Sequence, residues 1–488
     1  MDKKKIYLDT LGCKVNQYET ACVLDEFLCH GYEETQVMDM ADVVIINTCT
    51  VTNRTDYKSR NLIAKAVKIK HGRPGVKIVV TGCYGQNHRD EIMASGLVDF
   101  VVDNNDKNRI FEYIKDSQKI GFTDADEFME FTEMSMNSMN ERSRAFLKIQ
   151  DGCDFNCSYC IVPSVRGKPR CRSFESIIKQ VEKLLAGSRE LRSGDFQSPS
   201  SMLQAPTQRV VGYEEIVLGG INLGLYADLD KLLYTLAKYD KLKRIRLSSI
   251  EPQLFSDSLL TAIGDINKVC PHFHIPLQTG SDYLLKLHGR KYTTKQFKEL
   301  ISKLQAIKPH CAFGFDVIVG LPSETDELFN ETYELLKCID LAYLHVFIYS
   351  KRKGTEAAKM KAQVHGSVAK ERSNKLLELE VIKREKYINK LIEEKVILYA
   401  VAESYDVANG MFSGTTDRYV KARYEVQGLR QSEIDTTTTP RRKRHPSDRG
   451  ELSEIDTTKE GMRYEVGSMF KLIPIKNINN EVYCEVIK

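Results

Sequence analysis

Short apolar segments alternate with helical patterns along the first 110 residues. Candidate strands at residues 6–8, 43–46 and 77–80 flank segments such as residues 16–29, where apolar side chains recur at helical spacing. Strands that alternate with helices predict a parallel, doubly wound sheet. In such sheets ligands bind beyond the carboxyl ends of the strands. We therefore expect an α/β domain over about residues 1–120.

A second and longer alternation begins near residue 145. Helical patterns separate six further apolar segments, which predicts a partial (β/α)6 barrel over about residues 140–365, with its active site at the carboxyl ends of the strands. The Ser-, Pro- and Gln-rich stretch at about residues 188–208 is predicted to be a surface insertion. The candidate strands are residues 145–149, 216–218, 245–247, 273–277, 313–319 and 344–349.

The remainder of the chain changes character twice. Residues 366–394 are charged and helical in period, which predicts a connecting helix that acts as a solvated spacer. Residues 395–488 are rich in β-branched residues and Tyr, which is typical of a small all-β module. Within this module, about residues 427–462 are predicted to form an insertion. Its basic run at residues 441–444 fits an RNA contact and a solvated loop equally well.

Composition and charge narrow the class of protein only slightly. Hydrophobic residues make up 42% and charged residues 28% of the chain, so wholesale disorder is not expected. The net charge of +4 does not identify a nucleic-acid binder, and any RNA contact must come from local patches. The longest apolar runs fall short of the roughly 18 residues of a membrane span, and the start lacks the apolar core of a signal peptide. We expect a cytoplasmic protein that does not act at a membrane.

The thirteen cysteines argue against a disulfide framework, because their number is odd and the chain is long. Three of them, Cys13, Cys49 and Cys83, each follow a candidate strand of the first domain. A single cysteine after a strand is usually a small buried residue. Three at equivalent positions of a parallel sheet meet at one edge, so they indicate a shared metal or cluster site.

A second cysteine set has a tighter spacing. Cys153, Cys157 and Cys160 form C-x3-C-x2-C at the end of the first barrel strand. Three thiolates this close can hold three irons of a 4Fe-4S cluster and leave the fourth iron without a protein ligand. A structural zinc site requires a fourth Cys or His ligand at regular spacing, and no such residue follows nearby. Cys171 comes eleven residues after Cys160 across a basic segment and is not expected to be a ligand.

This spacing resembles that of the radical S-adenosylmethionine enzymes, in which S-adenosylmethionine binds the open iron. The resemblance implies that the reduced cluster cleaves this cosubstrate to a 5′-deoxyadenosyl radical, while the protein orients the reactants and excludes water. It also implies cosubstrate contacts at the strand ends of the barrel, where glycines allow close approach to the backbone. The expected cofactor-binding residues are Tyr159, Gly219, Gly220, Asn222, Ser249, Glu251, Gln278 and Asp316.

Two three-cysteine sets, on a doubly wound domain and a partial barrel, resemble the methylthiotransferase family over nearly the whole chain. Residues 412–420 resemble the signature of its TRAM domain, a small OB-like module, although Thr415 stands where Tyr is usual. The resemblance implies a second 4Fe-4S cluster that supplies sulfur and is held by Cys13, Cys49 and Cys83. Two 4Fe-4S clusters and S-adenosylmethionine are therefore the expected cofactors.

Residues 10–20 look most like the family branch that modifies N6-threonylcarbamoyladenosine in tRNA. Other branches modify isopentenyladenosine in tRNA or an aspartate of a ribosomal protein. The resemblance implies methylthiolation of adenine C2 beside the anticodon, with one S-adenosylmethionine methylating the sulfur and a second furnishing the radical. A non-catalytic metal-cluster RNA-binding protein is the alternative from another class. The expected partners are the anticodon arm of tRNA, a reductant such as flavodoxin or ferredoxin, and a sulfur source.

A substrate with a threonine carboxylate is expected to bind near a positively charged side chain of the protein. In addition, the basic strip at residues 166–172 and the TRAM-like module would hold the anticodon arm through phosphate and stacking contacts. The candidate substrate-binding residues are Lys14, Arg166, Lys168, Arg170, Arg172 and Arg352.

Overall fold

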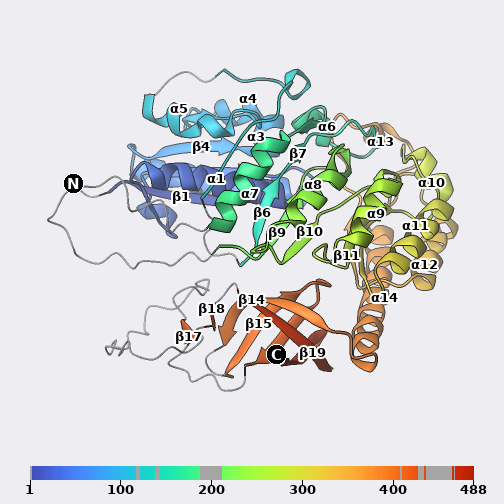
Figure 1. The fold of residues 1–488 in the computed structure, drawn as a ribbon. Coiled ribbons are helices and arrows are strands. Elements are labelled where there is room, and N and C mark those ends of the chain that lie inside the picture. The colour runs from blue at the N-terminus through green and yellow to red at the C-terminus, as the bar shows by residue number, and fades with distance from the viewer. Residues whose placement is uncertain are drawn as a thin grey trace, which may run out of the picture.

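The computed structural model describes residues 3–116, 121–137, 143–186, 212–406, 409–426, 434–435, 464–465 and 468–487. Two α/β domains and then an all-β module follow one another along the chain, as the change from blue to red in Figure 1 shows. This architecture confirms the predicted fold class. The predicted insertion at 188–208 and the basic run at 441–444 lie outside the described residues. Within the described ranges, no helix is both long and apolar enough to cross a membrane.

The N-terminal domain is a five-stranded parallel sheet in the order β2-β1-β3-β4-β5. Every residue of β3 is buried, as expected for a central strand with helices on both faces. The strands are β1 (Lys5–Thr10), β2 (Glu33–Glu34), β3 (Val43–Thr48), β4 (Lys77–Thr81) and β5 (Phe100–Val101). The helices are α1 (Lys14–Cys29), α2 (Asn53–Gly72), α3 (Gly82–Asn87), α4 (Arg89–Met93) and α5 (Ile110–Asp116), with the 3-10 turns η1 (Met38–Met40), η2 (Lys107–Arg109) and η3 (Ala125–Glu127).

Six parallel strands form the central partial barrel. They pair as two three-stranded sheets, β10-β9-β6 and β11-β12-β13, which a bridge from Ile245 to Val269 links. The strands are β6 (Ala145–Lys148), β9 (Glu215–Gly219), β10 (Arg244–Leu247), β11 (His272–Gln278), β12 (Ala312–Val319) and β13 (Tyr343–Ile348). The longer helices are α7 (Phe174–Ala186), α8 (Leu229–Ala237), α9 (Asp257–Asp265), α11 (Thr294–Ile307) and α12 (Asp326–Cys338). Short elements are β7 (Gln150–Asp151), α6 (Val162–Arg166), β8 (Arg170–Cys171), η4 (Leu223–Leu225), η5 (Pro252–Leu254), α10 (Asp282–Leu287) and α13 (Glu356–Lys359).

The two faces of the barrel strands differ in polarity. On β11, Phe273 and Ile275 belong to the large hydrophobic core that the surrounding helices complete. Because side chains alternate along a strand, His272 and His274 lie on the opposite face, toward the lumen. Over residues 272–275 of β11, the side chains that face the lumen are therefore polar, and those on the outer face are apolar.

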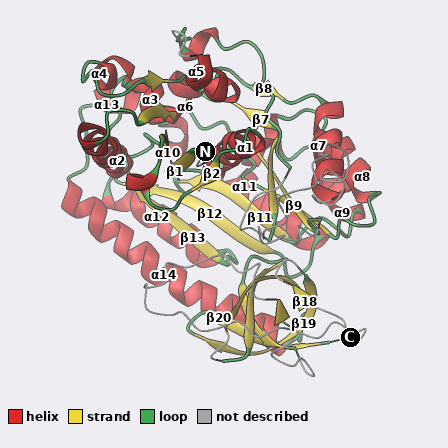
Figure 2. Ribbon diagram, turned by 90° about the vertical axis from the view of Figure 1, so that its left-hand side faces the viewer, coloured by secondary structure: helices red, strands yellow, loops and turns green. Residues whose placement is uncertain are grey.

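Helix α14 (Gly366–Glu393) corrects the prediction of a solvated spacer. Leu376, Ile388 and Leu391 are fully buried, and the helix runs along the β13 side of the barrel down to the C-terminal module (Figure 2). The sequence did not reveal the buried face of α14, because some of its charged side chains are buried together with the apolar ones. Lys383, for example, donates hydrogen bonds to the backbone carbonyls of residues 337 and 339.

The C-terminal module is a closed barrel of five strands in the order β14-β15-β16-β20-β19. Phe412, Tyr424 and Phe470 pack together in its own core. Arg246 of β10 donates to the carbonyls of Thr416 and of residue 417, which seats the module at the amino end of the central barrel. The strands are β14 (Leu398–Asp406), β15 (Met411–Thr416), β16 (Lys421–Glu425), β19 (Met469–Ile478) and β20 (Glu481–Val486), and β17 (Ile434–Asp435) pairs with β18 (Tyr464–Glu465).

Candidate functional site

Cys13, Cys49 and Cys83 lie together at the carboxyl ends of β1, β3 and β4, where the sequence placed them. Gly12 and Gly82 turn the chain directly before two of them, with φ angles of +98° and +90°. A Cβ on Gly12 would lie 2.8 Å from the sulfur of Cys49, and one on Gly82 would lie 2.3 Å from a backbone oxygen of β3. Glycine is required at both turns, because only it allows this φ and this close approach together.

The thiols of this first trio are close enough to influence one another. Burial, and after it the proximity of Cys83 and Cys13, raises the pKa of the Cys49 thiol to about 12. Metal coordination deprotonates a thiol outright, since the cation compensates the charge that burial and neighbouring sulfurs oppose. The trio is therefore suited to a cationic cluster.

The second trio lies on the loop between β7 and α6. Cys153, Cys157 and Cys160 are partly buried, and tight turns bring them together: the N–H of Cys160 donates to the carbonyl of Cys157 at 3.0 Å. Burial is the main cause that raises the pKa of Cys160 to about 12, and the neighbouring thiols of Cys157 and Cys153 add to it. This trio has the same suitability for a cluster as the first.

Arg290 contacts the second trio and was missed by the sequence analysis. Its Nη1 atom lies 3.4 Å from the sulfur of Cys157 and 3.1 Å from Oε1 of Glu251. A guanidinium at a ligating sulfur offsets negative charge and fixes the ligand. Glu251, predicted to contact the cofactor, is thus an ion-pair partner that holds Arg290. No spacing to a cysteine marks Arg290 in the sequence, because the contact spans 133 residues.

Buried polar atoms without a hydrogen-bond partner among the described residues mark the predicted cosubstrate site. They are the hydroxyl of Tyr159, both amide atoms of Asn222 and the hydroxyl of Ser248. Such an atom costs about 1–3 kcal/mol, so these groups fit a polar ligand such as S-adenosylmethionine. Tyr159 and Asn222 were predicted for this role. Ser248 has the buried hydroxyl, whereas the prediction was its neighbour Ser249.

The predicted glycines have a packing reason. A Cβ on Gly219 would lie 2.1 Å from the ring of Phe146, and one on Gly220 would lie 2.7 Å from Oε1 of Gln150. Gln150 also accepts the N–H of Asn222 at 2.8 Å and donates to the carbonyl of residue 152, one residue before the cysteine loop. The glycine segment and the cysteine loop are therefore tied through Gln150, another residue that the sequence did not single out.

Two predicted strand-end residues differ in their placement. Gln278 does end β11, and it has a φ of 63° next to an irregularity in strand register, which places it at the mouth of the barrel. Asp316 is not at a strand end. It is the fifth residue of β12, inside the lumen, and is ion-paired with His274 and His345. The strand ends at Val319, as the sequence predicted, so Asp316 lies before this end, and its contact with the cofactor stays a prediction.

Most of the predicted substrate-binding cations are buried partners of carboxylates. Arg166 pairs with Glu19 and Asp151, Arg172 with Glu133, and Arg352 with Asp56. Arg170 is also buried and lies over the ring of Phe128, whereas Lys14 and Lys168 are exposed. Residues 166–172 therefore do not form an exposed basic strip. The sequence shows the charges but not their partners, many of which are more than 100 residues away.

Arg166 belongs to a buried ion network that joins the N-terminal domain to the barrel. Glu19 on α1 contacts Lys107, Lys148 and Arg166, and Asp151 lies 2.6 Å from Lys148 and 3.1 Å from Arg166. Arg166 also donates to Oδ1 of Asn16, which is 3.9 Å from the sulfur of Cys13. The network thus fixes the first trio relative to the barrel.

We expect Glu19→Gln to lower the free energy of unfolding by about 3–5 kcal/mol, because it leaves buried cations without their countercharge. Burial would raise the pKa of Glu19, but Arg166, Lys107 and Lys148 outweigh it and hold the pKa well below its usual value. The stabilisation is therefore present above about pH 4 and is lost as the pH falls further, so the difference between wild type and variant should shrink in acid.

Urea unfolding at several pH values checks this prediction. The matched control is Glu33→Gln, whose pair with Lys3 is exposed at the surface, with an expected change of at most about 1 kcal/mol. A loss for Glu19→Gln no larger than that of the control would contradict a stabilising network.

The two trios adjoin across the domain interface. Cys83 packs against Ile161 and Val165, and Ile161 directly follows Cys160. The loop of the second trio and one cysteine of the first therefore meet at the interface between the two domains.

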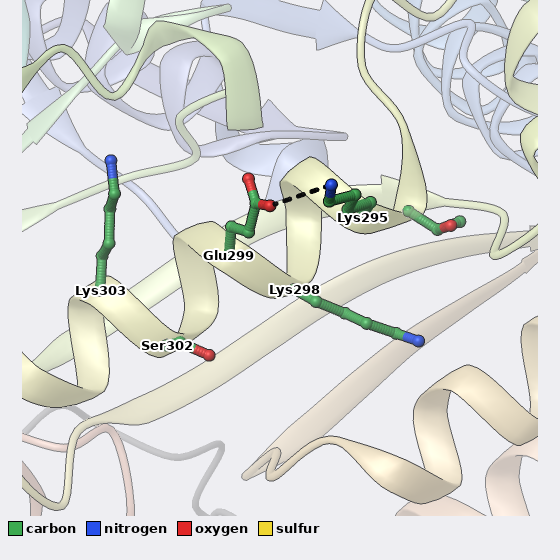
Figure 3. A pocket seen from close by; sticks show the side chains of 6 residues that line it. Lys295, Lys298, Glu299, Ser302 and Lys303 are labelled. Carbon is green, nitrogen blue, oxygen red and sulfur yellow. Dashed lines mark ion pairs between the residues drawn. The ribbon is translucent and has the colours of Figure 1, made fainter.

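Two surface hollows of the described structure lie away from these residues. One, of about 510 Å³, lies along the outer side of α11, where Lys295 pairs with Glu299 (Figure 3). Another, of about 990 Å³, lies between α14 and the segment before β12. Neither is lined by a predicted site residue, so neither changes the assignment of the site.

Comparisons with known proteins identify the family of the two α/β domains. The model of the uncharacterized protein family UPF0004 matches residues 5–103, which include the first trio, and that of the radical SAM superfamily matches residues 202–336. The radical SAM methyltransferase TsrM from Kitasatospora setae, solved with cobalamin and a [4Fe-4S] cluster bound, matches with a TM-score of 0.51 at 13% identity, over 73% of this chain and 77% of that chain. This likeness shows the fold alone.

Sequence relatives are more specific. The chain is 38% identical over 430 residues to the threonylcarbamoyladenosine tRNA methylthiotransferase MtaB of Bacillus subtilis (strain 168), over 85% of this chain and 89% of the relative. It is 33% identical over 407 residues to the tRNA-2-methylthio-N(6)-dimethylallyladenosine synthase of Bacillus cytotoxicus, over 80% and 75%. The chain therefore belongs to the methylthiotransferase family of radical S-adenosylmethionine enzymes, which are transferases that use S-adenosylmethionine and a 4Fe-4S cluster.

Proposed function

We propose that this protein adds a methylthio group to C2 of N6-threonylcarbamoyladenosine beside the anticodon of tRNA, with two molecules of S-adenosylmethionine per turnover. The higher identity to the Bacillus subtilis threonylcarbamoyladenosine enzyme, 38% against 33% for the dimethylallyladenosine enzyme, supports this branch. Isopentenyladenosine in tRNA and an aspartate of a ribosomal protein are the alternative substrates. Membership of an enzyme family argues against the non-catalytic RNA-binding alternative.

The observation that carries the proposal is that Cys83 of the first trio packs against Ile161, the residue that follows Cys160 of the second trio. We assign Cys153, Cys157 and Cys160 to the radical cluster and the first trio to a second 4Fe-4S cluster. When bound, these groups supply an electron, a radical and sulfur, chemistry that acid–base side chains cannot provide at an unactivated carbon.

The chain's own residues bind and orient the reactants. The unpartnered polar atoms of Tyr159, Asn222 and Ser248 would hydrogen-bond the cosubstrate, and the Arg290–Glu251 pair would keep Cys157 in place. Lys168 remains exposed near the loop for a contact with the anticodon arm. A flavodoxin or ferredoxin as reductant, a separate sulfur source and a cytoplasmic location complete the proposal.

The test is mass spectrometry of nucleosides after reaction. Anaerobically reconstituted protein is incubated with S-adenosylmethionine, dithionite and anticodon stem-loops that carry threonylcarbamoyladenosine or isopentenyladenosine. We expect the 2-methylthio product from the threonylcarbamoyl substrate. Product from the isopentenyl substrate alone, or from neither, would contradict the proposal.

A further inference from the structure

The lumen of the central barrel holds a polar cluster that the cysteine sites do not use. His274, Asp316 and His345 come from β11, β12 and β13, and Asp316 lies opposite His345 in the strand register. Nε2 of His274 is 3.0 Å and Nδ1 of His345 is 3.2 Å from the same Oδ1 of Asp316. Tyr343 holds His274 from the other side, with its hydroxyl 3.0 Å from Nδ1.

Of the three side chains, His345 has a ring nitrogen that can still form a hydrogen bond. Burial would raise the pKa of Asp316, but hydrogen bonds from His274 and His345 outweigh it and hold the pKa well below its usual value, so Asp316 is a carboxylate that orients both rings. Both nitrogens of His274 are engaged, and its side chain is only 11% exposed. The side chain of His345 is 51% exposed and uses Nδ1 for Asp316, which leaves Nε2 to bind a ligand.

The charges that act on the neighbouring His272 are positive, and Glu380, the acidic side chain of α14 that His345 influences, is itself paired with Arg384. Burial, and after it the positive charges of Arg246, His274 and Lys14, holds the pKa of His272 well below its usual value. Lys14 reaches in from α1, with Nζ 5.5 Å from the ring centroid of Tyr419 of the C-terminal barrel. Cations from separate parts of the chain therefore act on the same region of the lumen.

The position of the cluster indicates which anion. His345 lies three residues before the end of β13, which is about 10 Å below the mouth of the barrel at roughly 3.3 Å per residue. The cysteine loops are at the mouth. A nucleobase that enters with its reacting carbon toward the cysteines would extend its N6 substituent into the lumen, whereas the tRNA phosphates would stay outside. The N6 substituent of threonylcarbamoyladenosine ends in a carboxylate.

We propose that His345 donates a hydrogen bond to the carboxylate of the N6 substituent, and that Asp316 and His274 position its ring. This inference rests on the proposed function and adds the residue that selects the substrate. A charge-assisted hydrogen bond would favour the acid. An apolar substituent would desolvate His345 without giving it a partner, and a neutral ester would accept only a weaker hydrogen bond, so the same residue would disfavour both.

The test compares two stem-loops, one with threonylcarbamoyladenosine and one with its methyl ester, which is neutral but similar in shape. Binding to protein with both clusters reconstituted is measured by fluorescence anisotropy, without reductant. We expect wild type to bind the acid about 10-fold tighter than the ester, and His345→Gln to reduce this ratio to less than about 2-fold. The matched control is His71→Gln, exposed at the end of α2, which should keep the wild-type ratio.

Three results would overturn the inference. Unchanged affinity of His345→Gln for both stem-loops would exclude the contact, and equal weakening of acid and ester, which keeps the ratio, would show a purely structural role. The three ligand atoms lie within 4.8 Å of one another, so a divalent metal beyond the cluster iron, lost in His345→Gln, would assign them to a metal site instead. A wild type that binds the modified stem-loops no better than an unmodified one would contradict the proposed function itself.

Discussion

Cys157→Ser should abolish the reductive cleavage of S-adenosylmethionine. Cys157 is the middle cysteine of its trio, and its sulfur accepts a hydrogen bond from Arg290. The substitution therefore removes both a proposed ligand and the sulfur that Arg290 positions. Loss of an outer partner alone typically costs about 10–100-fold in metal-site activity, and loss of a ligand should exceed this. We expect 5′-deoxyadenosine formation to fall more than about 100-fold.

The measurement is dithionite-dependent release of 5′-deoxyadenosine, with iron content determined on the same sample. Cys171→Ser is the matched control: it is exposed in the same domain, and its thiol donates only to the carbonyl of Leu225 at 3.5 Å. The control should retain wild-type cleavage. Near-normal cleavage by Cys157→Ser would refute the assignment of this trio to the radical cluster.

The cysteine sites were predictable because their signals are local. Cys153, Cys157 and Cys160 fall within eight residues, and the first trio recurs at the same place after each of three strands. Parallel sheets bring such positions to one edge whatever the rest of the fold, so the sequence was enough to group Cys13, Cys49 and Cys83. The contact of Cys83 with Ile161 needed the structure, because it joins two domains.

The surroundings of the sites could not be predicted, because they depend on distant partners. Arg166 looked like a surface cation, yet its countercharge Glu19 is 147 residues away. Arg290 and Gln150 carry no motif and gain their roles through contacts with Cys157 and Asn222. Charge along a sequence indicates where ion pairs are possible, but only packing decides which of them are buried.

Cys49→Ser separates the two cysteine sites by function. Cys49 is buried between Gly12 and the other two cysteines, and its backbone carbonyl, which accepts a hydrogen bond from Ser59, is unchanged by the substitution. Serine is close in size, so the fold and the second trio should persist. We expect 5′-deoxyadenosine formation within about 2-fold of wild type, because the proposed ligands of the radical cluster remain.

Methylthiolated nucleoside, in contrast, should fall more than about 100-fold in Cys49→Ser, since the site proposed to supply sulfur would lose a proposed ligand. Iron should fall from about eight to about four per chain. Cys29→Ser, exposed on α1 of the same domain, is the control and should change neither product. If Cys49→Ser and Cys157→Ser lost cleavage equally, the two trios would act as one unit rather than as a radical site beside a sulfur site. Cleavage without sulfur insertion would show instead that one trio drives the radical step and the other completes the transfer.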